Sequence, residues 1–285
     1  VISNLERLTL EWKHSLELNS RLEHEDCPDL QYLIAVELLF DVDENENRNL
    51  PIKILQKAAP NLKTMSINAC RSLEVFRTPV PEINENRMLT ELFLTDVWKL
   101  KSFGSGGAPE DLLNMICKKL QELAVIDCPH FTALLHSPSS VSFSYLKDLL
   151  IYKCQRLTHL FTSSAAKELI HLEYIQVSEC KSIQEIVARE EDETASGEVK
   201  LQQLHGIYLS NLSSLECFYT GNQTLQLPSL VRVYIDKCPK MEIFSQGSIG
   251  PNSFREITTW ADPNNRPIVF HDDLNNSVKK VFLHQ

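Results

Sequence analysis

Apolar residues recur along the chain in a fixed pattern of six positions. Leu62, Met65, Ile67, Cys70, Leu73 and Phe76 form one copy, and the same internal spacing returns in six further copies. The further copies begin at Leu89, Leu120, Leu146, Leu172, Leu204 and Leu230, at intervals of 27, 31, 26, 26, 32 and 26 residues. A repeat of this period indicates a solenoid, in which each unit is too small to bury its apolar side chains alone.

The spacing within one copy predicts the course of one coil. The second and third positions are two residues apart, so they point to the same face of a short strand. The fourth position falls where the strand ends and the chain turns, and the fifth and sixth lie on the returning segment. Stacked coils then share one core and one parallel sheet, which predicts an α/β solenoid with the sheet on the concave face. Short helices or irregular segments are expected on the convex face, with helices over 51–59, 109–120 and 162–172.

The strength of the pattern divides the chain into three parts of a single expected domain, 1–285. Strong repeats cover 62–250, weaker ones 1–61, and the segment 251–285 breaks the pattern and is expected to cap the open end. In the weak part, Leu5-x-x-Leu8-x-Leu10 and Leu30-x-x-Leu33 fit the strand positions. A register that places Cys27 in the fourth position fits as well, and the sequence does not distinguish the two.

Composition and charge exclude several classes of partner. The chain has 28 Lys+Arg against 38 Asp+Glu, a net charge of -10, which disfavours binding to nucleic acid. No apolar stretch approaches the roughly 18–20 residues of a membrane span, and no signal peptide is visible at Val1. Eight cysteines in 285 residues are too sparse for a disulfide scaffold and favour reduced thiols in a cytoplasmic protein.

No metal, cofactor or catalytic site is predicted. Five cysteines occupy the fourth repeat position and none forms a short C-x2-4-C pair, so buried structural thiols are expected instead of zinc ligands. Asp41-x-Asp43-x-Asn45 begins like a calcium loop but has Glu46 and Ile52 where that loop needs Gly and Glu. No nucleophile motif such as G-x-S-x-G occurs, and the chain is predicted not to be an enzyme.

The strand positions between the buried ones should face solvent, and they are rich in apolar and aromatic residues. Exposed groups of this kind in a contiguous band are typical of protein interfaces, although the ordinary strand preference for Tyr and Phe also accounts for them. Lysines and arginines alternate with carboxylates beside this face, a mixed field that suits a protein partner. The predicted partner-binding residues are Phe93, Ile126, Leu150, Tyr152, Tyr174, Tyr208 and Tyr234.

The repeat unit resembles the C-terminal leucine-rich repeats of plant intracellular disease resistance proteins of the nucleotide-binding, coiled-coil type. The resemblance is clearest in RLTHLFTSSAAKELIHLEYIQVSECKSIQEIVARE, 156–190, and in LPSLVRVYIDKCPKM, 227–241. It implies a horseshoe-shaped leucine-rich-repeat solenoid that senses pathogen effectors or guarded host proteins and contacts the receptor's own nucleotide-binding domain.

The resemblance does not extend to nucleotide chemistry, and it leaves one alternative function open. The Gly-x4-Gly-Lys-[Ser/Thr] motif of the receptors' ATP-binding switch is missing from this chain, so no nucleotide site is assigned to it. The alternative is the substrate-binding leucine-rich-repeat domain of a ubiquitin ligase adaptor, which uses the same scaffold.

Overall fold

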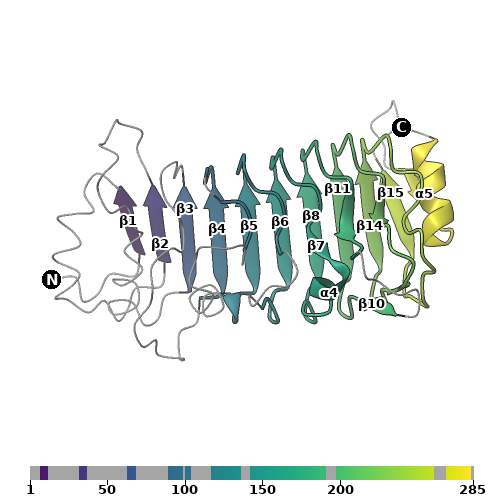
Figure 1. The fold of residues 1–285 in the computed structure, drawn as a ribbon, viewed down its shortest axis with the longest axis horizontal. Coiled ribbons are helices and arrows are strands. Elements are labelled where there is room, and N and C mark those ends of the chain that lie inside the picture. The colour runs from purple at the N-terminus through teal and green to yellow at the C-terminus, as the bar shows by residue number, and fades with distance from the viewer. Residues whose placement is uncertain are drawn as a thin grey trace.

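The computed structural model is dominated by one sheet of eleven strands that stand side by side in a single row (Figure 1). The structure describes residues 7–11, 32–36, 63–68, 89–98, 100–103, 117–135, 142–190, 197–259 and 268–283. All neighbouring strands in the sheet are parallel except the last pair. In sheet order the strands are β1 (Arg7–Glu11), β2 (Tyr32–Val36), β3 (Thr64–Asn68), β4 (Glu91–Thr95), β5 (Glu122–Ile126), β6 (Asp148–Tyr152), β8 (Tyr174–Ser178), β11 (Gly206–Ser210), β14 (Arg232–Asp236), β15 (Glu256–Thr259) and β16 (Ile268–Phe270).

The register of the sheet confirms the repeat. Met65 pairs with Leu92, and Leu123, Leu149 and Ile175 continue the same row on the next strands. The row extends backwards to Leu33 and Leu8, which resolves the register of the weak repeats. Since β1 pairs directly with β2, the strands follow the spacing that begins at Leu5 and Leu30. Cys27 itself lies outside the described residues.

Repeat positions throughout the described coils form one continuous core. From Leu120 to Phe244 the side chains at all six positions are at most 2% exposed, as expected for groups that only neighbouring coils can cover. Aromatic rings link the returning segments of adjacent coils: Phe103 meets Phe131 edge-on at 6.4 Å, and Phe218 stacks on Phe244 at 4.8 Å. Burying each such side chain contributes about 1.5–3 kcal/mol, so the core is the main source of stability.

The returning side of the coils carries shorter elements. A second parallel sheet consists of β12 (Cys217–Tyr219), β9 (Glu185–Ala188) and β7 (Phe161–Thr162), and a two-stranded sheet pairs β10 (Glu198–Lys200) with β13 (Thr224–Gln226). Sequence reasoning did not predict these strands, because each has only two to four residues and lies between the fifth position of one repeat and the start of the next copy.

The helix predicted over 162–172 is wrong in its length. Thr162 caps the short helix α4 (Ser163–Ala166), as its hydroxyl favours, but the helix ends at Ala166. Beyond it, the amides of Leu169 and Leu172 bond to carbonyls three residues back, on Ala166 and Leu169. All three side chains are fully buried, and a three-residue turn keeps them on one side where an α-helix would rotate them away. Of the other predicted helices, 51–59 and most of 109–120 lie outside the described residues.

The C-terminal end of the sheet is closed by a different arrangement. Strand β16 runs antiparallel to β15, and helix α5 (Leu274–Phe282) packs beside it with Leu274, Val278 and Val281 buried (Figure 1). The side chain of Asn275 accepts hydrogen bonds from the amides of Phe244 and Ser245 and donates one to the carbonyl of Ser245. These bonds satisfy backbone groups of the last coil that no further coil covers.

Candidate functional site

The open face of the main sheet displays three rows of side chains. Within each five-residue strand from β3 to β14 the second and fourth residues are buried, so the first, third and fifth point outward. We name these outward positions the leading, middle and trailing rows. The middle row consists of Ser66, Phe93, Ala124, Leu150, Gln176, Tyr208 and Tyr234.

The seven predicted partner-binding residues all lie on this open face, but in different rows. Tyr174 (leading row) and Tyr208 (middle row) are the most exposed of them, at 41% and 39%. The other five are half-buried: Phe93, Leu150 and Tyr234 in the middle row, and Ile126 and Tyr152 in the trailing row.

Two positions of the middle and trailing rows are not open to solvent, contrary to the sequence-based expectation. Ala124 is only 4% exposed, because its methyl group lies between the larger side chains of Phe93 and Leu150 on the adjacent strands. Asp236 in the trailing row is also buried, at 7%. The alternation of buried and exposed residues along a strand predicts the direction of each side chain. It does not predict how much of a small side chain is covered by its larger neighbours.

Aromatic rings gather over β8, β11 and β14. The rings of Tyr208 and Tyr234 are 6.3 Å apart, and Tyr174 lies 6.4 Å from the ring of His205. Tyr174 pairs with Gly206, and a Cβ at Gly206 would come within 2.8 Å of the tyrosine ring. Gly206 therefore makes room for Tyr174 to lie against the sheet. Sequence reasoning missed this role, although a glycine inside a strand is a signal of close approach.

Carboxylates occupy the leading row over β4, β5 and β6. Glu91, Glu122 and Asp148 are cross-strand neighbours in register, an arrangement of like charges that is destabilising. Burial, followed by the negative charges of Glu91 and Asp148, raises the pKa of Glu122. Burial, followed by the charge of Glu173, raises the pKa of Asp148, while Lys147 opposes this. Reading the leading row down the repeats would have revealed this acidic row from sequence.

Ion pairs confirm the mixed charge expected along the rest of the face. Lys147 lies 3.7 Å from Glu173, and Arg232 lies 3.5 Å from Glu256, one coil further on in each case. These side chains are partly or largely exposed, and each such pair contributes at most about 1 kcal/mol. They order the surface more than they stabilise the fold.

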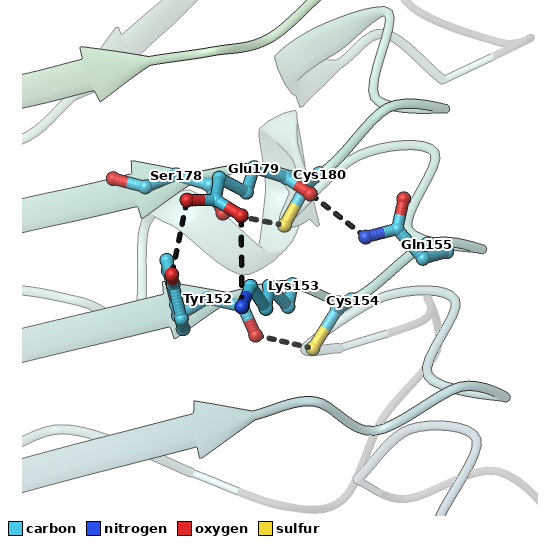
Figure 2. Close-up of polar contacts among 7 residues, drawn as sticks. All are labelled: Tyr152, Lys153, Cys154, Gln155, Ser178, Glu179 and Cys180. Carbon is cyan, nitrogen blue, oxygen red and sulfur yellow. Dashed lines mark hydrogen bonds and ion pairs between the residues drawn. The ribbon is translucent and has the colours of Figure 1, made fainter.

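A polar cluster joins two coils at the trailing edge (Figure 2). The hydroxyl of Tyr152 donates to a carboxylate oxygen of Glu179 at 3.0 Å, and the ammonium of Lys153 lies 3.8 Å from the other oxygen. Gln155 donates to the backbone carbonyl of Glu179 at 2.9 Å. The hydrogen bond to Glu179 thus fixes the orientation of the Tyr152 ring at the edge of the open face.

In the main sheet, each strand from β4 to β14 is followed directly by a left-handed residue. Their φ angles lie between 50° and 57°, although none of them is glycine: Asp96, Asp127, Lys153, Glu179, Asn211 and Lys237. The amide of the left-handed residue bonds to the carbonyl that ends the next strand, as from Lys153 to Ser178 and from Glu179 to Ser210. The hydrogen-bond ladder therefore continues past the strands and offsets the cost of the strained conformation.

The cysteines at the fourth repeat position line the inside of these turns. Cys154 and Cys180 donate from Sγ to the carbonyl two residues back, on Tyr152 and Ser178 (Figure 2). The six described cysteines are all buried and free, and burial raises the pKa of the Cys238 thiol to about 12. Cys70 and the loop 41–47 lie outside the described residues.

The described residues offer no group of three or more His, Cys, Asp or Glu side chains placed to hold a metal ion. Within the same parts of the chain, no helix is both long and apolar enough to cross a membrane.

Comparison with known proteins identifies the repeat. The profile of the family "Plant disease resistance protein RPS2-like, leucine-rich repeats" matches residues 45–181 and 136–249. Among solved structures, the chain is similar to the crystal structure of InlP from Listeria monocytogenes, with 14% sequence identity and a TM-score of 0.39. That similarity covers 82% of this chain and 65% of the InlP chain. A search of curated proteins finds no match.

Proposed function

Since the chain belongs to the RPS2-like family of plant disease resistance leucine-rich repeats and is a leucine-rich-repeat protein-recognition domain, we propose that it is the sensor of a plant immune receptor. In this role it binds a pathogen effector or a guarded host protein in the cytoplasm and catalyses no reaction. The family match favours this role over that of a ubiquitin ligase adaptor.

The observation that carries the proposal is the aromatic half of the open face. Tyr174 and Tyr208 are the most exposed aromatic side chains on this face, and Tyr234 lies beside Tyr208. Tyrosine is favoured at the centres of protein interfaces, because its rigid ring buries a large area at small entropic cost. Exposed rings in adjacent strands give a partner a contiguous surface to cover.

The face also suits an intramolecular partner. A receptor that is silent without its ligand needs a contact that the ligand competes with, and the partner proposed here is the receptor's own nucleotide-binding domain. The ion pairs beside the tyrosines supply polar contacts that fix the register of either partner.

Site-directed photo-crosslinking in plant cells tests the proposal. A benzophenone amino acid is placed at position 208, on the open face, and at position 216, where an exposed Glu precedes β12 on the other side of the coil. The expected result is an effector, a host protein or a nucleotide-binding domain cross-linked from position 208 in infected tissue but not from 216. Cross-links to core subunits of a ubiquitin ligase, or equal cross-linking from both positions, would overturn the proposal.

A further inference from the structure

The outward side chains of β4, β5 and β6, which we name the β4–β6 strip, differ from the aromatic half of the open face. Their middle row is apolar: Phe93 and Leu150 are half-buried, and Ala124 lies between them in register. In the trailing row, Ile126 adds a further half-buried apolar side chain. A narrow apolar stripe thus crosses the three strands.

Carboxylates flank the stripe on both sides. Glu91, Glu122 and Asp148 stand on the leading side. On the other side, the left-handed residues Asp96 and Asp127 follow β4 and β5, and Lys153 follows β6. Among the described residues, no side chain forms an ion pair or hydrogen bond with the carboxylate of Glu122 or Asp148, although Lys147 lies near Asp148. The leading carboxylates therefore repel one another without full compensation.

The electrostatic cost of this row of carboxylates indicates that the row serves to bind a partner. The pKa values of Glu122 and Asp148 are raised by partial burial and by their acidic neighbours, so the charged form of each carboxylate carries an electrostatic penalty in this row. A cationic partner would relieve that penalty, which in the described coils is opposed only by Lys147, and only at Asp148.

The dimensions of the strip fit one kind of secondary structure. The first and fifth residues of a strand are about 13 Å apart, at about 3.3 Å per residue, close to the 10–12 Å diameter of a helix. Three strands at about 4.8 Å spacing span roughly two helical turns along the row. A helix laid across the strands would place its apolar face on the middle row and its two flanks beside the carboxylates.

We propose that the β4–β6 strip binds an amphipathic helix of a protein partner, whose apolar stripe is flanked on both sides by Lys or Arg. The proposal rests on the recognition function proposed above and specifies the chemistry of the partner. The helix seats its apolar residues on Phe93 and Leu150, and its cations pair with Glu122 and Asp148 on one side and Asp127 on the other. In this mode of recognition, a surface contacts apolar residues that recur along the partner at the spacing of one helix face.

A synthetic peptide tests the proposal without knowledge of the natural partner. The probe is an 18-residue helix with a leucine stripe and flanking lysines, and its counterpart has glutamate at every lysine position. Binding to the whole chain is measured by fluorescence anisotropy at physiological salt. We expect saturable binding of the lysine peptide only, and about tenfold weaker binding by Glu122→Gln/Asp148→Asn, since this variant loses two of the carboxylates that pair with the lysines.

The control variant Glu216→Gln/Glu242→Gln changes the net charge equally at exposed positions outside the open face. It should bind the lysine peptide within about twofold of the unmodified chain. If both variants bind the lysine peptide equally weakly, the overall negative charge of the chain explains the binding and the proposal is overturned. Equal binding of the two peptides, or no binding of either, would also overturn it. Melting temperatures of both variants verify that each is folded.

The two proposals fail separately. If an effector or host protein cross-links from position 208 but binds the Glu122→Gln/Asp148→Asn variant unchanged, the helix-binding strip is excluded and the recognition function stands. If the lysine peptide binds as expected and position 208 yields no specific cross-link, the sensor function is excluded instead.

Discussion

The Sγ atom of Cys154 donates a hydrogen bond to the backbone carbonyl of Val125, in the preceding coil, at 3.6 Å. Cys128 and Cys238 make the same contact with Leu94 and Leu209, at 3.9 and 3.8 Å. A thiol in this position both fills a small buried space and donates to a carbonyl, which explains why the repeat favours cysteine where the strand turns. Val97 and Leu212 fill the same position with packing alone.

Replacing Cys154 by alanine should lower the free energy of unfolding by about 1–3 kcal/mol. The variant loses buried volume, and the Val125 carbonyl loses the hydrogen bond from the thiol. Urea unfolding monitored by circular dichroism measures the change. Cys180→Ala is the matched control, since Cys180 is equally buried but its only backbone acceptor in the described coils is Ser178 of its own coil. Equal losses in the two variants would show that the bond between coils adds nothing to packing.

Replacing Lys237 by glycine should stabilise the chain by up to about 1 kcal/mol. Lys237 has a φ of 50°, a conformation that costs a residue with a Cβ about 1–2 kcal/mol and costs glycine little, while glycine's greater unfolded entropy offsets part of the gain. Thermal unfolding gives the change in melting temperature. Lys240→Gly, at a nearby exposed position outside the left-handed set, should be neutral or destabilising. A lower melting temperature for Lys237→Gly would contradict the prediction that the left-handed conformation of Lys237 is strained.

Neutralising the acidic row should stabilise the free protein in a pH-dependent way. Folding raises the pKa values of Glu122 and Asp148 above their ordinary values of 4.5 and 3.8, so the folded chain holds these protons more tightly than the unfolded chain. The free energy of unfolding therefore falls as the pH rises through the window between unfolded and folded pKa values. Glu122→Gln/Asp148→Asn should melt higher than the unmodified chain at pH 7, and the difference should shrink as the pH approaches 4. Calorimetry at several pH values checks this, and a constant difference would exclude the electrostatic origin.

Removing the two neighbouring tyrosines should separate binding from stability. Tyr208→Ala/Tyr234→Ala deletes the ring pair on the outer side of the sheet and should weaken partner binding while changing the free energy of unfolding by no more than about 1 kcal/mol. Affinity for the partner found by cross-linking is the measurement, with Leu283→Ala, an exposed apolar position after α5, as the control. Unchanged affinity would remove both tyrosines from the binding surface.

The core and the direction of the outward side chains followed from sequence because both depend on short-range spacing. The alignment of Met65 with Leu92 and Leu123 needs only the repeat and the two-residue period of a strand. The left-handed turns were not predicted, because Asp96, Lys153 and Glu179 lack the glycine that usually marks them. Their conformation is imposed by hydrogen bonds to the next coil.

For the candidate surface, the sequence predicted that the seven side chains lie on one face, but it did not predict how exposed each of them is. Ala124 is covered by Phe93 and Leu150, and Gly206 accommodates Tyr174, and both effects depend on side chains from adjacent coils. The acidic row was readable from the repeats but requires comparison across three strands at the same position. Cross-strand neighbours therefore decide which parts of a repeat surface a partner can reach.

The reversed strand at the C-terminal end has a consequence for self-association. The outer edge of β15 is already occupied by β16, which runs the opposite way, and α5 packs against β15. A second molecule that offered a strand in the direction of the other coils would meet no matching template there. The edge of β15 is thus closed to a coil of a second molecule, so the parallel row of strands cannot be extended from that edge.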